Sequence, residues 1–363
     1  MKKLLALALC AAMVLSVAAC GNKETTTPSN TTEKTEEKTE EKTEEKTEEK
    51  AAVEPTVLKM NVTPAETSNI YKSAVVLSDK VLEYTEGRYK IEVYANEQLA
   101  GGDLQKGVEM IFTGVVDVDG HSVINMTGFE PKLTISMMPW IYTGGLDEVD
   151  SVLRNGGAGG AKYEELIAAK GAKVIGMAEN GFRQLTNNVR PVYEPADMER
   201  LKIRVPPITM YVDLFKLFGS DPVTMNFGEV FTALQQGTID GQENPIDTIR
   251  SGQINEVQKY MTMWNYSYDP YMLTVSQKVW DSLSDADKEA FLKAGEEAAW
   301  YNCDLNRTND TTTLENFKKG GTEVNDLTTE QAAAFQEAAA PIYDMYREKI
   351  GDDVFAAFGY TFE

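Results

Sequence analysis

Few residues of this chain combine reactive side chains in a pattern that catalysis would need. His121 is the only histidine, and Cys303 is the only cysteine beyond the first 20 residues. Together they could act as a base and a nucleophile. Cys303, however, lies in a stretch with amphipathic helical spacing, where a buried cysteine usually serves as a small apolar residue. We therefore expect no nucleophilic chemistry from this pair.

Two further segments only partly match known ligand-binding motifs. Residues 156–162 (GGAGGAK) are similar to a phosphate-binding loop, but Ala161 stands where a glycine must precede the lysine and Tyr163 where a hydroxyl residue must follow it. We expect a flexible loop before a helix there. Residues 117–120 (DVDG) match the start of a calcium loop without its later acceptors. No HExxH or GxSxG pattern occurs, so the sequence predicts no enzyme, no cofactor and no metal site.

The charge balance limits the partners of this protein. The chain carries 57 acidic and 35 basic residues, a formal net charge of −22. Such a negative field disfavours nucleic acids and anionic lipid surfaces as partners. It would also repel a small anion. If the chain binds one, the attraction must come from a few arginines in a sheltered site.

The N-terminus predicts export. Lys2 and Lys3 precede an apolar run at 4–19, which has the length of a signal-peptide core and is short for a membrane span. Small residues lead to Cys20, so we expect a lipoprotein signal peptide at 1–20 with lipidation of Cys20. An ordinary secretory signal or an uncleaved anchor helix are the alternatives. The lipid would hold the protein on the outer face of the cytoplasmic membrane, in a bacterium without an outer membrane.

The next segment differs in composition from the rest of the chain. Residues 21–56 contain four copies of Thr-Glu-Glu-Lys and almost no apolar side chains, which predicts a disordered charged tether. The body that follows alternates strand and helix patterns, which predicts an α/β fold with mainly parallel sheets. Strands are expected at 57–62, 89–95, 115–118, 173–178 and 201–205, and helices at 70–82, 162–170, from Ser284 and from Thr328, with a kink at Pro341.

The second half of the body contains a series of short motifs in a fixed order. They are GFRQ at 181–184, LKIRVP at 201–206, PVTMNFGEV at 222–230, DGQENP at 240–245 and EVQKY at 256–260. This series closely resembles the extracytoplasmic solute receptors of tripartite ATP-independent periplasmic (TRAP) transporters, and the resemblance extends from Leu58 to the C-terminus. It implies a two-lobed periplasmic-binding-protein-like (Venus flytrap) fold with a long connecting helix. Lobe 1 would comprise 57–180 plus about 269–308, and lobe 2 would comprise 181–268 plus about 309–363.

The resemblance assigns binding roles to four residues. Arg204 would pair with the carboxylate of the ligand through its guanidinium fork. From strand alternation alone, Arg204 shares the side of Lys202 and could equally be a surface ion-pair residue. Arg183 would be a second arginine near the ligand or part of a structural ion pair. Asn244 would orient the ligand or occupy a turn, and Phe227 would line the cleft or belong to the core.

Five further positions are weaker candidates for ligand contact. His121, Ser122 and Asn125 follow the expected strand at 115–118, where receptors of this family place ligand-selecting side chains. Ser122 and Asn125 are uncharged where some relatives carry charge, which leaves the selection of charged substituents open. Asn187 could reach the cleft or cap a turn, and Tyr266 could stack on a sugar ring.

The resemblance implies a receptor that captures a small organic acid and delivers it to the permease subunits of a transporter. We favour a sugar acid such as a uronate or an aldonate, because the candidate site is rich in neutral hydrogen-bonding groups. A C4-dicarboxylate is the alternative and would need a second cation, which Arg183 could supply. A secreted hydrolase and a surface adhesin are distant alternatives. We expect a monomer.

Overall fold

The first strand shows how sequence alternation becomes a buried sheet. A computed structural model describes residues 54–362, and in it β1 (Thr56–Val62) buries Leu58 and Met60 and exposes Lys59 between them. β1 pairs in parallel with β2 (Tyr89–Tyr94) and with β3 (Val118–Ser122). Helix α1 (Asn69–Tyr84) crosses over between β1 and β2 and packs on β2. This βαβ unit has the form expected for an α/β protein.

The first sheet continues into two long antiparallel strands. Its order is β2-β1-β3-β9-β4, with β9 (Tyr268–Ser276) antiparallel to both β3 and β4 (Ala172–Asn187). β4 has 16 residues and continues well beyond the strand expected at 173–178. From Arg183 onward it leaves β9 and pairs with strands of the second sheet. A single strand thus belongs to both sheets.

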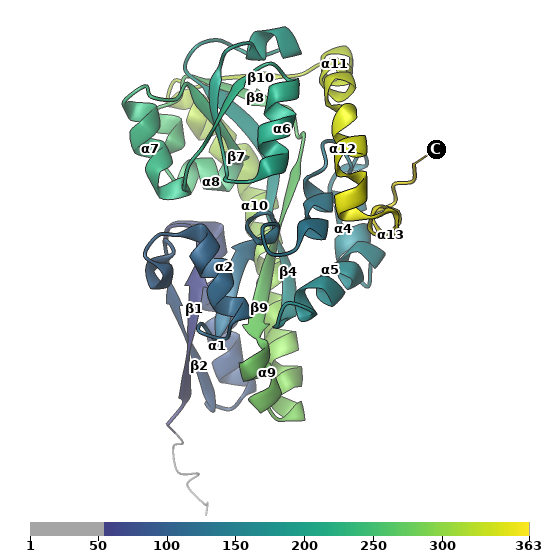
Figure 1. The fold of residues 1–363 in the computed structure, drawn as a ribbon. Helices are drawn as coiled ribbons and strands as arrows, with labels where there is room; N and C mark the ends of the chain where they lie inside the picture. Colours follow the sequence, from purple (N-terminus) through teal and green to yellow (C-terminus); the bar gives the residue numbers. More distant parts are fainter. Residues whose placement is uncertain (1–53, 363) are drawn as a thin grey trace, which may run out of the picture. The chain divides into compact units, whose positions relative to one another are not determined.

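The second sheet is built around the C-terminal end of β4. It contains β7 (Gly241–Pro245), β5 (Lys202–Val205) and β6 (Asp221–Thr224) on one side, and β8 (Tyr260–Met263) and β10 (Glu323–Asp326) on the other. The outer pairs are parallel, and only the pairs that involve β4 or join β3 to β9 are antiparallel. The fold is therefore a mixed α/β two-domain fold of the periplasmic-binding-protein type with mostly parallel sheets, as predicted (Figure 1).

Helices cover both sheets. The remaining α-helices are α2 (Leu104–Phe112), α3 (Val123–Met126), α4 (Gly145–Leu153), α5 (Ala158–Ala168), α6 (Thr209–Leu217), α7 (Phe227–Gln235), α8 (Ile246–Ser251), α9 (Gln277–Ser282), α10 (Asp285–Lys319), α11 (Thr329–Ala339), α12 (Pro341–Ile350) and α13 (Asp352–Ala357). Short 3₁₀-helices occur at η1 (Gln98–Ala100), η2 (Pro131–Met137), η3 (Pro195–Met198) and η4 (Ile254–Glu256). The last two helices pack on the first half of the chain, α12 against η2 and α13 against α5.

The 35-residue helix α10 is the long connecting helix that the family resemblance implies. Ser284 caps its N-terminus by accepting from the backbone N–H of Asp287, as the sequence predicts. The helix packs against α1, β4 and α8, and it spans both groups of elements in Figure 1. A Cβ added to Gly295 would meet the backbone oxygen of Ile175 at 2.2 Å, so the helix contacts β4 backbone to backbone. Cys303 belongs to this helix, and its side chain is fully buried.

Three local predictions are wrong. The strand expected at 115–118 begins only at Val118, because Gly114 turns the chain with a φ of +68° and Val115 is left 68% exposed. The glycine-rich segment before 162 is the first turn of α5 rather than a flexible loop, since Gly160 lies directly against the backbone of Leu153. Pro341 does not kink a helix but starts α12 as its first residue.

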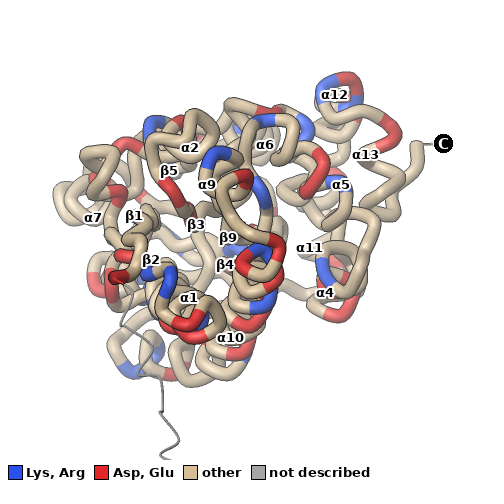
Figure 2. Tube along the Cα trace, turned by 90° about the horizontal axis from the view of Figure 1, so that it is seen from below, with Lys and Arg blue, Asp and Glu red and all other residues tan. Residues whose placement is uncertain are grey.

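Charged residues of both signs alternate over the surface, for example along α10 (Figure 2). Within residues 54–362 no helix is both long and apolar enough to cross a bilayer. The same residues contain no group of three or more histidine, cysteine, aspartate or glutamate side chains placed to hold a metal ion. The predicted signal peptide, Cys20 and nearly all of the predicted tether lie outside the described residues.

Candidate functional site

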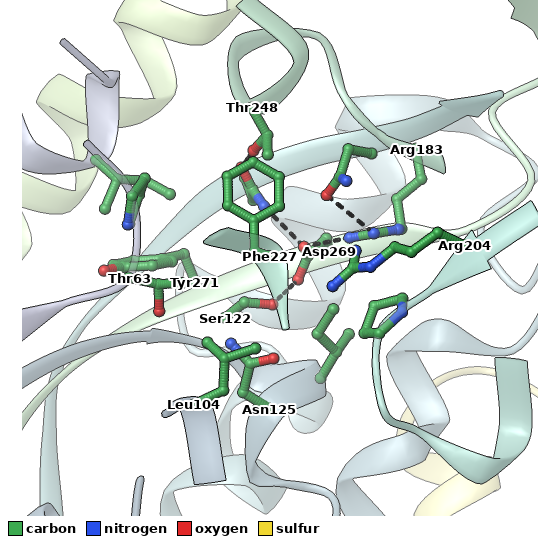
Figure 3. Close-up of a pocket in the computed structure, with 16 residues that line it drawn as sticks. Thr63, Leu104, Ser122, Asn125, Arg183, Arg204, Phe227, Thr248, Asp269 and Tyr271 are labelled. Carbon is green, nitrogen blue, oxygen red and sulfur yellow. Dashed lines mark hydrogen bonds and ion pairs between the residues drawn. The ribbon is translucent and has the colours of Figure 1, made fainter. Parts of the chain in front are cut away.

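One pocket collects side chains from both sheets. Its empty volume is about 480 Å³, which includes space open to solvent. The first sheet and its loops contribute Thr63, Pro64, Ile70, Leu104, Ser122, Ile124, Asn125, Asp269 and Tyr271. β4 contributes Asn180 and Arg183, and the second sheet with its helices contributes Arg204, Pro206, Phe227, Asn244 and Thr248. Figure 3 shows these side chains converging on a common space.

Arg204 brings a buried cation without a carboxylate partner into this pocket. It sits on β5, between β6 and β7, and only 1% of the residue is exposed, so the surface interpretation of its strand position is wrong. Its Nε and Nη2 donate to the backbone oxygen of Met225 at 3.1 and 2.8 Å. Within residues 54–362 no carboxylate forms an ion pair with it. Burial lowers the pKa of Arg204 to about 9, and the positive charge of Arg183 adds to this, yet Arg204 stays protonated at neutral pH.

Arg183 lies beside Arg204 but is already engaged. Its Nε and Nη2 donate to the carboxylate of Glu243, and its Nη1 donates to Asp269 Oδ2 at 2.8 Å. Nη2 also reaches Asn244 Oδ1 at 3.1 Å. Burial would lower the pKa of Arg183, but the charge of Glu243 outweighs this and raises it well above its usual value. Both expectations for Arg183 therefore meet in one residue, which lines the pocket and forms a structural ion pair.

Phe227 and Asn244 shape the side of the pocket that belongs to the second sheet. Phe227 is the first residue of α7, and its ring centroid lies 6.0 Å from the guanidinium carbon of Arg204. A ring at this distance is attracted to the cation and holds it in place. Asn244 precedes Pro245, the last residue of β7; its side chain donates to Gln242 and accepts from Arg183. Both residues were predicted near the ligand, and both line the pocket.

Ser122 and Asn125 line the opposite side. Ser122 ends β3 and donates its hydroxyl hydrogen to Asp269 Oδ1. The side-chain amide of Asn125, in the short helix α3, forms no hydrogen bond with any residue that the structure describes. Polar groups that remain unpaired at a pocket are available to a ligand.

Three predicted site residues lie elsewhere. His121 is buried in β3, where its Nδ1 and Nε2 face the carboxylates of Asp119 and Glu97. Asn187 accepts from the backbone N–H groups of Val189 and Arg190, so it caps a turn. Tyr266 is fully buried and donates to Glu243 at 2.7 Å. None of the three is among the residues that line the pocket.

The buried groups around His121 shift one another's pKa values. Burial would lower the pKa of His121, but Asp119 and Glu97 together raise it well above its usual value. Burial raises the pKa of Asp119 to about 6. The second carboxylate, Glu97, also accepts from Asn61 and from the Thr63 hydroxyl at 2.6 Å. Since Thr63 lines the pocket, the cluster lies one hydrogen bond behind it.

Sequence reasoning missed Asp269, Asn180 and Thr248. Asp269 belongs to β9, whose nine residues are all buried, and a carboxylate in such a strand must have specific partners. That conflict between charge and burial was visible in the sequence as an aspartate before an apolar run. Asn180 donates to Asp269 Oδ2 at 2.8 Å and accepts from Thr248 at 2.8 Å. These contacts tie the two sheets together at the pocket.

Comparison with known proteins gives one consistent result. Residues 60–349 match the model of the family described as bacterial extracellular solute-binding protein, family 7. The 2,3-diketo-L-gulonate-binding periplasmic protein of Escherichia coli is 29% identical over 80% of this chain and 86% of its own length. The C4-dicarboxylate-binding periplasmic protein of Rhodobacter capsulatus is 29% identical over 85% of this chain and 91% of its own length.

Solved structures extend this likeness to three dimensions. A TRAP periplasmic solute-binding protein from Polaromonas, bound to D-erythronate, superimposes with a TM-score of 0.79 at 32% identity and covers 85% of this chain and 100% of that one. The sugar acid binding protein of Advenella mimigardefordensis in complex with galactonate gives a TM-score of 0.79 at 27% identity, over 85% of this chain and 98% of that one.

Proposed function

The chain belongs to bacterial extracellular solute-binding protein family 7, the solute receptors of TRAP transporters, and we propose that its pocket captures a small organic acid whose carboxylate binds Arg204. Membership of this family makes the protein a transport receptor and not an enzyme. The earlier alternatives of a secreted hydrolase and an adhesin therefore lose their basis.

The observation that carries the proposal is the unpaired cation in the pocket. A guanidinium that is 1% exposed and has no carboxylate among the described residues is costly unless an anion approaches it. A ligand carboxylate can accept two parallel hydrogen bonds from the guanidinium fork. Low dielectric around the pair then strengthens the attraction, despite the negative charge of the whole protein.

We favour sugar acids as ligands. The pocket offers neutral hydrogen-bonding groups on several sides, namely Ser122, Asn125, Asn180, Asn244 and Thr248. Relatives described as binding D-erythronate, galactonate and 2,3-diketo-L-gulonate support this choice. The relative that binds C4-dicarboxylates keeps that class as the second candidate.

Calorimetric titration with Arg204→Ala tests the role of the arginine. We expect at least tenfold weaker binding of the acid that wild-type protein binds best, since losing one partner of a buried charge pair costs about 2–5 kcal/mol. A thermal-shift screen of organic acids identifies that ligand first. Arg200→Ala is the matched control, because the Arg200 side chain is 87% exposed four residues away. Unchanged affinity in Arg204→Ala, or a screen led by amines or neutral sugars, would overturn the proposal.

The remaining parts of the transport role follow from the same proposal. Lobe 1 comprises 57–180 plus about 269–308 and lobe 2 the rest of the body, a division supported by the change of β4 from one sheet to the other after Phe182. The receptor acts as a monomer, is held to the membrane by a lipid on Cys20, and delivers its ligand to the permease subunits of the transporter. Mass spectrometry of the membrane fraction tests the lipid, and mutation of Cys20 to Ala should release the protein into the medium.

A further inference from the structure

The charges around the pocket leave room for one negative group on the ligand. Two guanidinium groups, of Arg183 and Arg204, lie beside two buried carboxylates, of Glu243 and Asp269. Arg183 forms ion pairs with both carboxylates. A ligand therefore finds a single cation, Arg204, that is not already neutralised by an ion pair.

Asp269 is the only carboxylate among the residues that line the pocket. It is 0% exposed and lies at the centre of the lining side chains in Figure 3. Its Oδ2 accepts from Arg183 Nη1 and Asn180 Nδ2, both at 2.8 Å, whereas its Oδ1 accepts from Ser122 alone. A carboxylate has about four acceptor positions, so Oδ1 keeps capacity for one more donor.

Ser122 has the same bias. Because its hydroxyl hydrogen points to Asp269, its oxygen faces any ligand as an acceptor. Asp269 and Ser122 therefore both present acceptor oxygens, which pair with hydrogen-bond donors on the ligand. A hydroxyl group can donate to either oxygen, but a second carboxylate can donate to neither.

A second carboxylate would also meet repulsion. At a separation of 4 Å, two like charges repel by about 4 kcal/mol even at an effective dielectric constant of 20. Arg183 cannot relieve this without breaking its ion pair with Asp269 or Glu243. The neutral amide of Asn125, which has no partner within residues 54–362, accepts or donates to a hydroxyl without such a cost.

We propose that Asp269, held by Arg183 and aided by Ser122, selects acids that carry one carboxylate and neighbouring hydroxyl groups and excludes acids with a second carboxylate. This inference rests on the proposed function, because it takes the first carboxylate to bind Arg204. It assigns the ligand to the hydroxy monocarboxylates and removes the C4-dicarboxylates. Asp269 is thus a specificity residue that the sequence motifs do not mark.

Paired acids of equal carbon number test this selection. Calorimetry would compare D-erythronate with meso-tartrate, and D-galactonate with galactarate, because each pair differs by the oxidation of one terminal hydroxymethyl group to a carboxylate. In wild-type protein we expect the monocarboxylate of at least one pair to bind ten or more times tighter than its dicarboxylate. This ratio needs no variant, so it stands even where a substitution impairs folding.

Asp269→Asn then tests the cause. The amide keeps the shape and can still accept from Ser122, but it removes the negative charge and with it one of the two ion pairs of Arg183, leaving the pair with Glu243. We expect the ratio within a pair to fall at least tenfold, through weaker binding of the monocarboxylate and tighter binding of the dicarboxylate. Arg200→Ala serves as the control and should keep the wild-type ratio, since its side chain lies far out in solvent at 87% exposure.

The outcomes separate the two proposals. If wild-type protein binds the monocarboxylate and the dicarboxylate equally in both pairs, or if Asp269→Asn keeps the wild-type ratio, the selection by Asp269 is wrong while the acid-binding function stands. If no carboxylic acid binds the wild-type protein and an amine or neutral sugar does, the proposed function fails and this inference fails with it.

Discussion

Two buried charge clusters of this protein use similar residues for different ends. The pocket cluster places Arg204 and Arg183 near Glu243 and Asp269, and it leaves Arg204 without a carboxylate within the described residues. The cluster in β3 places His121 between Asp119 and Glu97, and both ring nitrogens are engaged. Burial alone does not distinguish them, since all these side chains are nearly inaccessible. The two clusters differ in that the pocket cluster has unused hydrogen-bonding capacity at a cavity.

The predicted contact of His121 with the ligand stays untested, and the structure gives its side chain other partners. His121 lies inside β3, its ring nitrogens face the carboxylates of Asp119 and Glu97, and it is not among the residues that line the pocket. We infer that the β3 cluster stabilises the fold, whereas the pocket cluster binds.

Replacing each arginine by methionine should have opposite consequences for stability. Arg183→Met leaves Glu243 and Asp269 buried without their cation and should lower the free energy of unfolding by about 5 kcal/mol. Arg204→Met removes a charge that has no carboxylate partner, so stability should stay level or rise while ligand binding is lost. Urea denaturation and calorimetry of both variants measure this. Equal destabilisation by the two variants would contradict the assignment of roles.

His121→Gln should reduce the free energy of unfolding by about 3 kcal/mol, because two buried carboxylates lose the cation between them. Asn61 and Thr63 still donate to Glu97 and limit the loss. Ligand affinity of the folded variant should remain within a few-fold of wild type. Lys80→Ala, which breaks a surface pair with Glu83, is the control and should change the free energy of unfolding much less than His121→Gln. A large loss of ligand affinity with little loss of stability would contradict this prediction and indicate that His121 contacts the ligand.

The raised pKa of His121 predicts how stability varies with pH. The unfolded chain releases the histidine proton near its usual pKa of about 6.5, whereas the folded protein retains it. The native state then holds more protons, so the free energy of unfolding should fall as pH rises above about 6.5. Denaturant titrations at successive pH values measure this slope.

A second group contributes with the same sign and needs its own control. Burial raises the pKa of Asp310 to about 7, so its carboxyl also favours the folded state at low pH. Asp310→Asn removes this contribution. If the slope persists in that variant, His121 is its source, and a flat profile would remove His121 from the account.

Thr63 joins the two clusters and should show the smallest effect. Thr63→Val keeps the volume but removes the hydrogen bond to Glu97, at a cost of about 1 kcal/mol in stability. Because Thr63 also lines the pocket, ligand affinity should fall as well, by less than in Arg204→Ala. Calorimetry and denaturation on the same variant separate the two effects. Unaltered stability would mean that Glu97 is sufficiently held by Asn61 and His121.

Much of the fold could be predicted from local patterns. Helix starts depend on residues three positions apart, and the helices expected from Ser284 and from Thr328 are confirmed as α10 and α11. The strand at 115–118 was placed too early because Val115 and Val116 look like strand residues, while the turn at Gly114 leaves Val115 exposed. Local propensity cannot anticipate which valine the tertiary fold buries.

The pocket was harder to predict. The motifs predicted ligand contact for Arg204, Arg183, Phe227 and Asn244, and all four line one pocket. The role of this pocket in binding stays a proposal. The place of Asp269 in the pocket was not predicted, because it depends on the ion pair with Arg183, which is 86 residues away in the chain. The partners of a buried charge are set by tertiary contacts, so the sequence could flag the conflict but not its resolution. The lobe boundaries and the lipid on Cys20 stay predictions.

The contact between Gly295 of α10 and Ile175 of β4 has a mechanical consequence. Neither backbone leaves space for even one methyl group, and Gly176 lies equally close to the oxygen of Gly295. This close backbone contact opposes sliding of the helix along the strand at this point. We therefore expect the helix and the strand to move together at this contact when the protein opens for a ligand. An alanine at position 295 would wedge them apart and disturb the opening without touching a single pocket residue.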